Sequence, residues 1–200
     1  RILFDGERAP REYRDDPSRH PIALITQHTT FLSDLPVGEF LRTHARIRAT
    51  NGGPDELVLE ALAFANQLTG EPINAAVRMT ELSGGQTRAL LIADAAIICS
   101  TPIVLLDEVE NAGIHRTRAI ELLRQYRKIF IFVTHDPRIA LLSDYRIVMR
   151  GGQMADVLHT NDEEQAFSHR VSRLDEALSH LRDQLRHGFR LTGRELENFA

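Results

Sequence analysis

Two adjacent carboxylates near the middle of the sequence are well placed to do chemistry. Asp107 and Glu108 directly follow the apolar run 103–106, which has the composition of a buried strand. In open α/β sheets, ligands bind beyond the carboxyl ends of the strands, so both side chains are expected at a binding edge. Carboxylate oxygens suit a hard cation such as Mg²⁺, and a neighbouring carboxylate can accept a proton from an attacking water. The pair therefore predicts a ligand-binding edge whose carboxylates suit a metal ion or the transfer of a proton.

A glycine-rich turn earlier in the chain offers a second kind of chemistry. Four residues stand at the start of an apolar, helix-like run that extends to Ile98: Ser83, Gly84, Gly85 and Gln86. Backbone without bulky side chains leaves its N–H groups accessible, and the positive end of the helix dipole attracts anions. We therefore predict that this turn binds an anion.

Strand-like and helix-like segments alternate around these residues. The sequence predicts strands at 2–4, 22–26, 103–106 and 129–133, helices at 84–98 and 116–126, and two edge strands around the glycines at 151–152. Between the second and third strands, two successive helical patterns indicate a helical subdomain. There Asp34 resembles an N-cap and Asp55 is expected to cap the second helix.

The segment after residue 162 has a different pattern. Apolar residues recur at alternating spacings of four and three, which is typical of a coiled-coil-like helix: Phe167, Val171, Leu174, Leu178, Leu181 and Leu185. The seam covers fewer than the three to four heptads of a secure dimerisation helix, so packing on its own domain is favoured over a zipper. Gly188 is expected to end the helix.

The motifs and their order resemble those of the ATP-binding-cassette (ABC) ATPases. Leu82–Gln86 is similar to the signature motif of that family, and Ile103–Glu108 is similar to its Walker B motif. Gln27, after the second predicted strand, resembles the Q-loop glutamine. His135, in Phe-Val-Thr-His-Asp, resembles the H-loop histidine. The resemblance covers roughly residues 1–155.

The segment that resembles the D-loop departs from the common pattern of the family. Asn111 and Ala112 stand where the family has this loop, which crosses the dimer interface. Val109 replaces a frequent proline, and Ile114 and His115 stand where an aspartate is usual. The communication between two sites that the family assigns to this aspartate is therefore not predictable here.

The resemblance implies an α/β fold of the P-loop NTPase type, with a mostly parallel sheet flanked by helices, an inserted helical subdomain and a C-terminal helix. The ATPase core would comprise residues 1–27 and 91–160. The helical subdomain with the signature motif would comprise residues 28–90, and a helical extension would comprise residues 161–200.

The resemblance also implies binding and hydrolysis of ATP with Mg²⁺. Asp107 and Gln27 would hold the metal, Glu108 would activate the attacking water with the help of Gln27, and His135 would contact the γ-phosphate. The residues expected to contact nucleotide across a head-to-tail dimer of two cassettes are Ser83, Gly84, Gly85, Gln86, Asn111 and Ala112.

The leading interpretation is the ATP-hydrolysing subunit of an ABC transporter, which closes as a dimer to drive transport through a transmembrane permease. Such a subunit is cytoplasmic and bound to the membrane through the permease. The alternatives are a soluble ABC ATPase without a transport role and a degenerate cassette that regulates without hydrolysis. Substrate and transport direction depend on partners and do not follow from this sequence.

The sequence contains no Gly-x-x-x-x-Gly-Lys-[Ser/Thr] motif, the loop that cradles phosphates and supplies a lysine in P-loop ATPases. Its one lysine, Lys128, precedes a predicted strand and cannot replace that loop lysine. In the family, the loop and an adenine-stacking aromatic lie upstream of the strand assigned to residues 2–4. We therefore expect an N-terminally truncated portion of a longer protein, which alone binds ATP poorly and is inactive.

Composition limits the remaining possibilities. A formal net charge of −4 gives no overall basic field for nucleic acid. The single cysteine, Cys99, excludes an intrachain disulfide framework and is expected to fill the core. No apolar run reaches the roughly 18 residues that a membrane-spanning helix needs.

Overall fold

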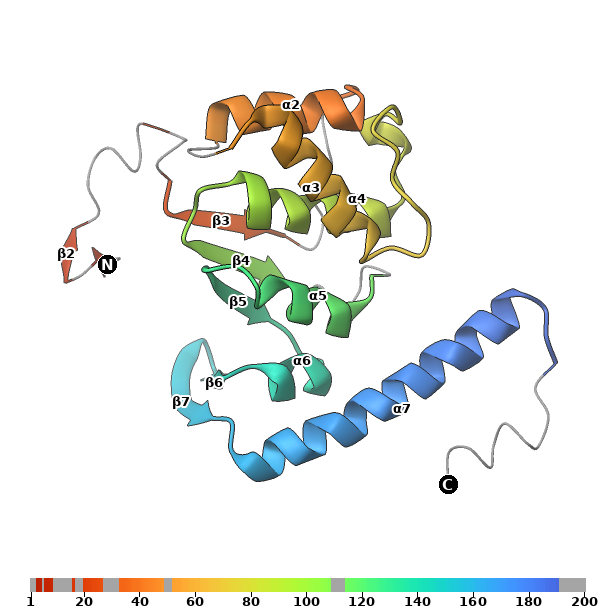
Figure 1. Ribbon diagram of the computed structural model, residues 1–200. Coiled ribbons are helices and arrows are strands. Elements are labelled where there is room, and N and C mark those ends of the chain that lie inside the picture. The colour runs from red at the N-terminus through yellow and green to blue at the C-terminus, as the bar shows by residue number, and fades with distance from the viewer. Residues whose placement is uncertain are drawn as a thin grey trace. The chain divides into compact units, whose positions relative to one another are not determined.

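The computed structural model describes residues 3–4, 6–8, 16, 20–26, 33–48, 52–108 and 114–190, and Figure 1 traces them in chain order. They separate into two compact units, residues 1–135 and 136–200. The strands are β1 (Leu3–Phe4), β2 (Glu7–Arg8), β3 (Ile22–Ile25), β4 (Ile103–Asp107), β5 (Ile129–Val133), β6 (Tyr145–Arg150) and β7 (Gln153–His159). The helices are α2 (Val37–Arg48), α3 (Pro54–Asn66), η2 (Met79–Glu81), α4 (Gly84–Ala93), η3 (Asp94–Ile98), α5 (Arg116–Leu123), α6 (Pro137–Leu142) and α7 (Asp162–Arg186).

The first unit is built on a three-stranded parallel sheet in the order β3-β4-β5. Ile25 pairs with Leu106, which in turn pairs with Phe132. Parallel strands need long crossover connections, and helices supply them here. The carboxyl ends of the three strands therefore meet at one edge, as the sequence predicts for an α/β fold.

The two faces of this sheet differ in burial. On one face, Val104 and Leu106 of β4 are 1% and 0% exposed. Because side chains alternate along a strand, the opposite face carries their neighbours. We call this the open face; its apolar residues are Ile22, Leu24, Ile103, Leu105, Ile129, Ile131 and Val133. Leu24 is 61% exposed and Val133 is 57% exposed, so among the described residues one face of the sheet belongs to the core and the other does not.

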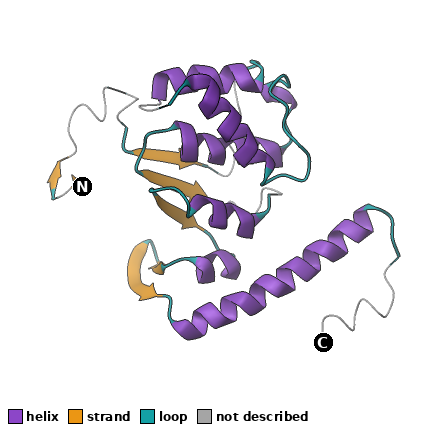
Figure 2. Ribbon diagram, viewed as in Figure 1, coloured by secondary structure: helices purple, strands orange, loops and turns teal. Residues whose placement is uncertain are grey.

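The helical segment between β3 and β4 contains α2, α3, η2, α4 and η3, and its helices are coloured purple in Figure 2. Helix α3 packs against both α2 and α4. This packing buries an apolar stripe on each helix because apolar residues recur at helical spacing. The buried residues of α2 and α3 include Val37, Leu41, Val58, Ala61 and Ala65. Packed helices thus occupy the segment where the sequence predicts a helical subdomain, and the predicted domain bounds stay a prediction.

Two predicted helix caps were wrong. Gly53 is the N-cap of α3 and Pro54 occupies the first turn, because the fixed φ of proline suits the first helical position. The Asp55 carboxylate accepts a hydrogen bond from Arg42 Nε at 2.7 Å instead. Asp34 lies three residues before α2. Its carboxylate accepts a hydrogen bond from the Thr80 hydroxyl at 2.6 Å.

The helix predicted over 84–98 consists of two parts. Regular α-helix ends at Ala93, and η3 is a π-helical turn closed by the Cys99 N–H, which donates to the Asp94 carbonyl oxygen at 2.9 Å. The Lys128 ammonium donates to the carbonyl oxygens of Ala95, at 2.7 Å, and Cys99. Carbonyls at a helix end need such partners, so a cation from outside the helix stabilises the wide turn.

The second unit contains an antiparallel hairpin and two helices. Strands β6 and β7 join through Gly151 and Gly152, whose φ angles are +55° and +77°. Helix α6 packs against α7. Gly188 has a φ of +77°, and the Phe189 N–H donates to the Gln184 carbonyl oxygen at 3.0 Å, which is the hydrogen bond of a Schellman C-cap. The predicted end of the long helix is confirmed.

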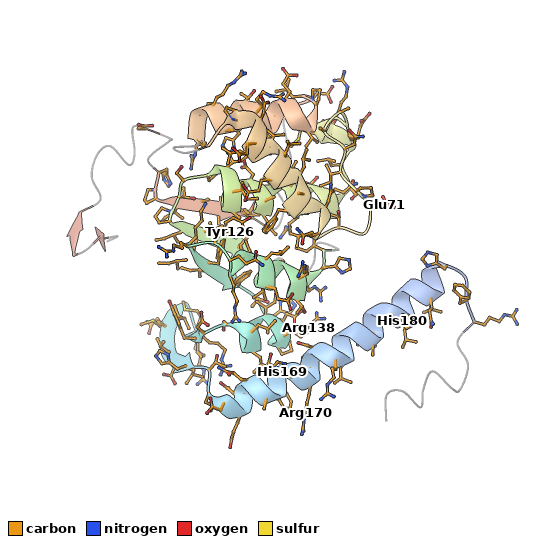
Figure 3. All side chains as sticks on the ribbon, viewed as in Figure 1. Glu71, Tyr126, Arg138, His169, Arg170 and His180 are labelled. Carbon is orange, nitrogen blue, oxygen red and sulfur yellow. The ribbon has the colours of Figure 1, made fainter. Side chains whose placement is uncertain are left out.

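The apolar seam of α7 is only partly covered within its unit. Four of its six residues are exposed: Phe167, Leu174, Leu178 and Leu185. The expectation that the seam packs on its own domain is therefore wrong for these four positions in this unit. Figure 3 shows polar side chains spread along the same helix, among them His169, Arg170 and His180. No helix within the described ranges is long and apolar enough to cross a bilayer.

Candidate active site

Three of the predicted site residues lie at or just beyond the carboxyl ends of the adjacent strands β4 and β5. Asp107 is the last residue of β4, and Glu108 follows it; both are half-buried. His135 lies two residues beyond the end of β5 and is exposed. The Glu108 N–H donates to the Val133 carbonyl oxygen at 2.9 Å. This bond ties the end of β4 to the end of β5, so the carboxylates and the histidine follow strands that are joined at this edge.

Gln27 lies outside the described residues, and its role stays a prediction. Thr26, the residue before it, directly follows β3. Since Ile25 pairs with Leu106, the chain reaches Thr26 beside the end of β4. Asn111 and Ala112 also lie outside the described residues, so their predicted D-loop contacts stay predictions too.

The backbone at Glu108 has an uncommon conformation. Its φ is +47°, and it is the one non-glycine residue with positive φ in the described part of the chain. For a residue with a side chain, this left-handed region is disfavoured by roughly 1–2 kcal/mol. Such conformations concentrate at functional sites and persist only where neighbouring groups hold them. The strained residue coincides with the carboxylate that the sequence predicts as the catalytic base.

The signature-like turn is the start of α4. The Gln86 N–H donates to Ser83 Oγ at 3.3 Å, and the Ser83 N–H donates to Gln86 Oε1 at 3.0 Å. This reciprocal pair is a capping box, and it satisfies two N–H groups at the helix start. Because Ser83 Oγ accepts in this pair, its own hydroxyl proton remains able to donate. Gln86 Nε2 also donates to the Glu71 carbonyl oxygen at 3.4 Å.

Gly84 has no structural requirement for glycine within this chain. Its φ is not positive, and a Cβ at this position would meet no atom of the described residues within 4 Å beyond its own helix backbone and chain neighbours. Glycine in a helix is less favourable than alanine by roughly 0.5–1 kcal/mol. Ser83 and Gly84 are exposed, and Gly85 is half-buried. The turn therefore presents open space and bare backbone outward, which fits the predicted binding of an anion.

Arg88 is a residue of this site that the sequence analysis missed. It lies on α4 and is 6% exposed, although arginine is rarely buried. Its guanidinium donates to the carbonyl oxygens of Asp107, at 2.9 Å, and Glu108, at 3.2 Å. A third bond reaches the Thr26 carbonyl oxygen at 3.1 Å. An arginine within an otherwise apolar helical face was the available signal.

A second group of polar residues lies away from this edge. The ligand-type atoms of His44, Asp94 and Cys99 lie within 4.8 Å of one another. His44 Nδ1 and Asp94 Oδ1 are 2.7 Å apart. Burial, reinforced by the Asp94 charge, raises the pKa of the Cys99 thiol to about 12. Because the Lys128 ammonium binds the same turn and the thiol keeps its proton, we interpret this cluster as a structural contact between α2 and η3.

Curated proteins similar to this chain are described as ATP-binding proteins. An uncharacterized ABC transporter ATP-binding protein of Methanocaldococcus jannaschii is 45% identical over 196 residues, which cover 98% of this chain and 74% of that protein. The spermidine/putrescine import ATP-binding protein PotA of Borrelia garinii subsp. bavariensis is 29% identical over 152 residues, 72% of this chain and 42% of that protein. The chain thus spans about three quarters of one relative and about two fifths of the other. No family model matches the chain.

Solved structures with the same fold are ATP-binding cassettes. A dimeric post-hydrolysis state of a cassette bound to ADP and Pi has a TM-score of 0.57 and 21% identity, covering 72% of this chain and 66% of that one. A bacterial Atm1-family ABC exporter with ATP bound has a TM-score of 0.56 and 19% identity, covering 74% of this chain and 27% of that one. These likenesses establish the fold, a P-loop NTPase-type α/β cassette, as the sequence motifs predict.

Proposed function

Because this chain belongs to the family of ABC transporter ATP-binding proteins, we propose that it carries out ATP hydrolysis as the nucleotide-binding subunit of a transporter. The observation that carries the proposal is the position of Asp107 and Glu108 at the carboxyl end of β4. That edge is where an α/β sheet binds its ligand. The Glu108 backbone is fixed there by its bond to Val133.

The proposed roles follow from the chemistry of each group. Asp107 offers half-buried carboxylate oxygens at this edge, which fit a Mg²⁺ ion, and Gln27 is the second proposed contact. When bound, Mg²⁺ would offset charge on the phosphates. Glu108 accepts a proton from the attacking water, and His135 donates to a γ-phosphate oxygen.

The signature turn is proposed to act on a nucleotide held by a second cassette. Ser83 can donate its hydroxyl, and the open space at Gly84 leaves room for phosphate oxygens. Gly85 is the next proposed contact along the same turn. This arrangement requires a head-to-tail dimer, in which Gln86, Asn111 and Ala112 also lie near the partner's nucleotide. The dimer would couple to a transmembrane permease at the cytoplasmic membrane face.

The test uses the complete reading frame that contains this chain. ATP hydrolysis is measured for the wild-type protein and for Glu108→Gln, which keeps shape and removes the base. We expect hydrolysis to fall by about 10²–10⁴-fold, the range of general base catalysis, with nucleotide binding retained. Glu56→Gln, at an exposed glutamate in the first turn of α3, is the matched control.

An unchanged rate in Glu108→Gln would contradict its assignment as the base. A wild-type protein that binds nucleotide without hydrolysis would favour a regulatory cassette. Purification from membranes, followed by identification of a co-purifying multi-span protein, tests the transport role. A protein that stays free of membrane partners would favour a soluble ABC ATPase.

A further inference from the structure

Arg88 is a buried cation, and a buried guanidinium needs hydrogen-bond acceptors. Its side chain leaves α4, the helix that begins with the signature turn, and is 6% exposed. Burial of a guanidinium without hydrogen bonds is strongly unfavourable. The planar group carries five N–H donors in a fixed geometry, so it can bind several carbonyl oxygens at once.

The partners of Arg88 lie at the ends of two neighbouring strands. Nη1 donates to the carbonyl oxygens of Asp107 and Glu108 at 2.9 and 3.2 Å. Nη2 donates to the Thr26 carbonyl oxygen at 3.1 Å. One side chain therefore joins the end of β3 to the end of β4 and to the two carboxylate-bearing residues. The side chain that makes this link comes from α4, the helix capped by Ser83.

The backbone that Arg88 binds is the strained backbone of the site. Glu108 has a φ of +47°, a conformation that must be held by its surroundings. The Glu108 N–H is fixed by the Val133 carbonyl at 2.9 Å, and its carbonyl oxygen is fixed by Arg88. Both peptide groups that flank the Glu108 Cα are thus bonded, one to β5 and the other to α4.

We propose that Arg88 is the positioning residue for Glu108: it holds the Glu108 backbone in its left-handed conformation and so fixes where the carboxylate lies. The proposal rests on the proposed hydrolytic function. Arg88 acts through Glu108, so its loss lowers the rate of hydrolysis and leaves ATP affinity unchanged. It also links the helix that serves the partner's nucleotide to the base of its own site.

The test compares Arg88→Met and Arg88→Lys with the wild-type protein in the complete reading frame. Methionine fills similar space without donors, and lysine keeps the charge but lacks the planar fork. A displacement of about 1 Å at a reacting group lowers rates by roughly 10²-fold. We expect a loss of kcat of about that size for Arg88→Met, a smaller loss for Arg88→Lys, and a Kd for ATP within about twofold of wild type.

Lys128→Met is the matched control. Lys128 is also a partly buried cation that donates to two backbone carbonyls, those of Ala95 and Cys99, away from Glu108. We expect its kcat to stay within about twofold of wild type. If Lys128→Met and Arg88→Met lower kcat equally, the effect is general loss of structure and the proposal is wrong.

A double variant separates positioning from an independent role. In the Glu108→Gln background, Arg88→Met should change the residual rate by less than about threefold, because residues that act as one unit are not additive. An equal fold-loss in both backgrounds would overturn the proposal. If Glu108→Gln itself has no effect, the proposed function fails instead.

A crystal structure of Arg88→Met gives a readout that does not depend on activity. We expect the φ of Glu108 to leave the left-handed region. If it remains near +47°, Arg88 does not hold this conformation. Arg88→Lys serves the same measurement if the methionine variant does not fold, with an altered φ expected there as well.

Discussion

Ser83 and Gln86 each satisfy a backbone N–H of the other at the start of α4. The serine that is proposed to meet the partner's nucleotide therefore already has a structural task in its own chain. A substitution at this position can change stability, anion binding or both. The two effects are separable because different side chains preserve the cap and the donor independently.

Ser83→Ala should lower the free energy of unfolding by about 1 kcal/mol, since alanine cannot cap the helix. Ser83→Asp keeps a good capping group but places a negative charge toward the phosphates, so stability should be retained. Urea unfolding measures the first effect, and nucleotide-dependent dimerisation measures the second. If the aspartate variant dimerises with ATP as well as wild type does, Ser83 does not face the nucleotide.

Leu106→Ala should be among the most destabilising changes in the first unit. Leu106 is fully buried in β4, next to the carboxylates. Removing a buried leucine side chain typically lowers the free energy of unfolding by about 2–5 kcal/mol. Leu59→Ala makes the same chemical change at a side chain that is 70% exposed, and should stay within about 0.5 kcal/mol. Similar losses from both variants in urea unfolding would contradict the assigned core.

Because of Cys99, the free energy of unfolding should fall at high pH. Burial raises the pKa of the folded thiol to about 12, against 9.0 as its ordinary value. Between these values the unfolded chain has released the proton and the folded protein retains it, so stability falls as pH rises. The contribution lost at pH 10.5 is about 2 kcal/mol at 1.36 kcal/mol per pH unit.

Urea unfolding of the wild-type protein and Cys99→Ala, at pH 8 and pH 10.5, measures this difference. The wild type should lose more stability than the variant between the two pH values. In the folded protein, the thiol should also react slowly with a disulfide reagent at pH 8. Parallel losses in the two proteins would show that Cys99 does not titrate this way.

In the second unit, the ionised Glu164 carboxylate should stabilise the folded state, and this stabilisation should be lost in acid. Arg146 Nη2 donates to Glu164 Oε1 at 2.5 Å, and this bond lowers the pKa of the Glu164 carboxyl. A lowered folded pKa stabilises the folded state above the ordinary value of 4.5, and the effect disappears as pH falls through the folded pKa.

Hydrogen exchange in the first turns of α7, measured at several pH values from 6 to 3, tests this effect. Protection should fall more in the wild type than in Glu164→Gln. Glu163→Gln removes the same charge at the preceding exposed position, and should behave like wild type. Identical acid profiles for Glu164→Gln and the wild type would exclude the ion pair as the cause.

The sequence predicted those parts of the fold that depend on local pattern. The apolar run before Asp107 formed a parallel strand with one buried face, and the residues after Ser83 formed a capped helix. Helix starts were less predictable, since proline at position 54 decided one start that an aspartate was expected to set.

Features that need distant residues were not predictable. The π-helical turn after Ala93 is bound by Lys128, which lies far away in the sequence. The positive φ of Glu108 depends on bonds to Val133 and Arg88. Local sequence does not identify either residue as a partner of Glu108, although Arg88 stands out as an arginine within an apolar helical face. The motif therefore located the carboxylates, and the tertiary structure determined how they are held.

The open face of the β3-β4-β5 sheet affects how these 200 residues behave in solution. Leu24 and Ile131 share one row across the strands, and Ile129 and Val133 extend it along β5. Contiguous apolar surface of this kind adheres to other apolar surfaces. Protein at high concentration should self-associate, bind hydrophobic dyes and adsorb to plastic. Leu24 is the most exposed of these leucine and isoleucine side chains. Leu24→Lys or Leu24→Glu should therefore reduce self-association most directly.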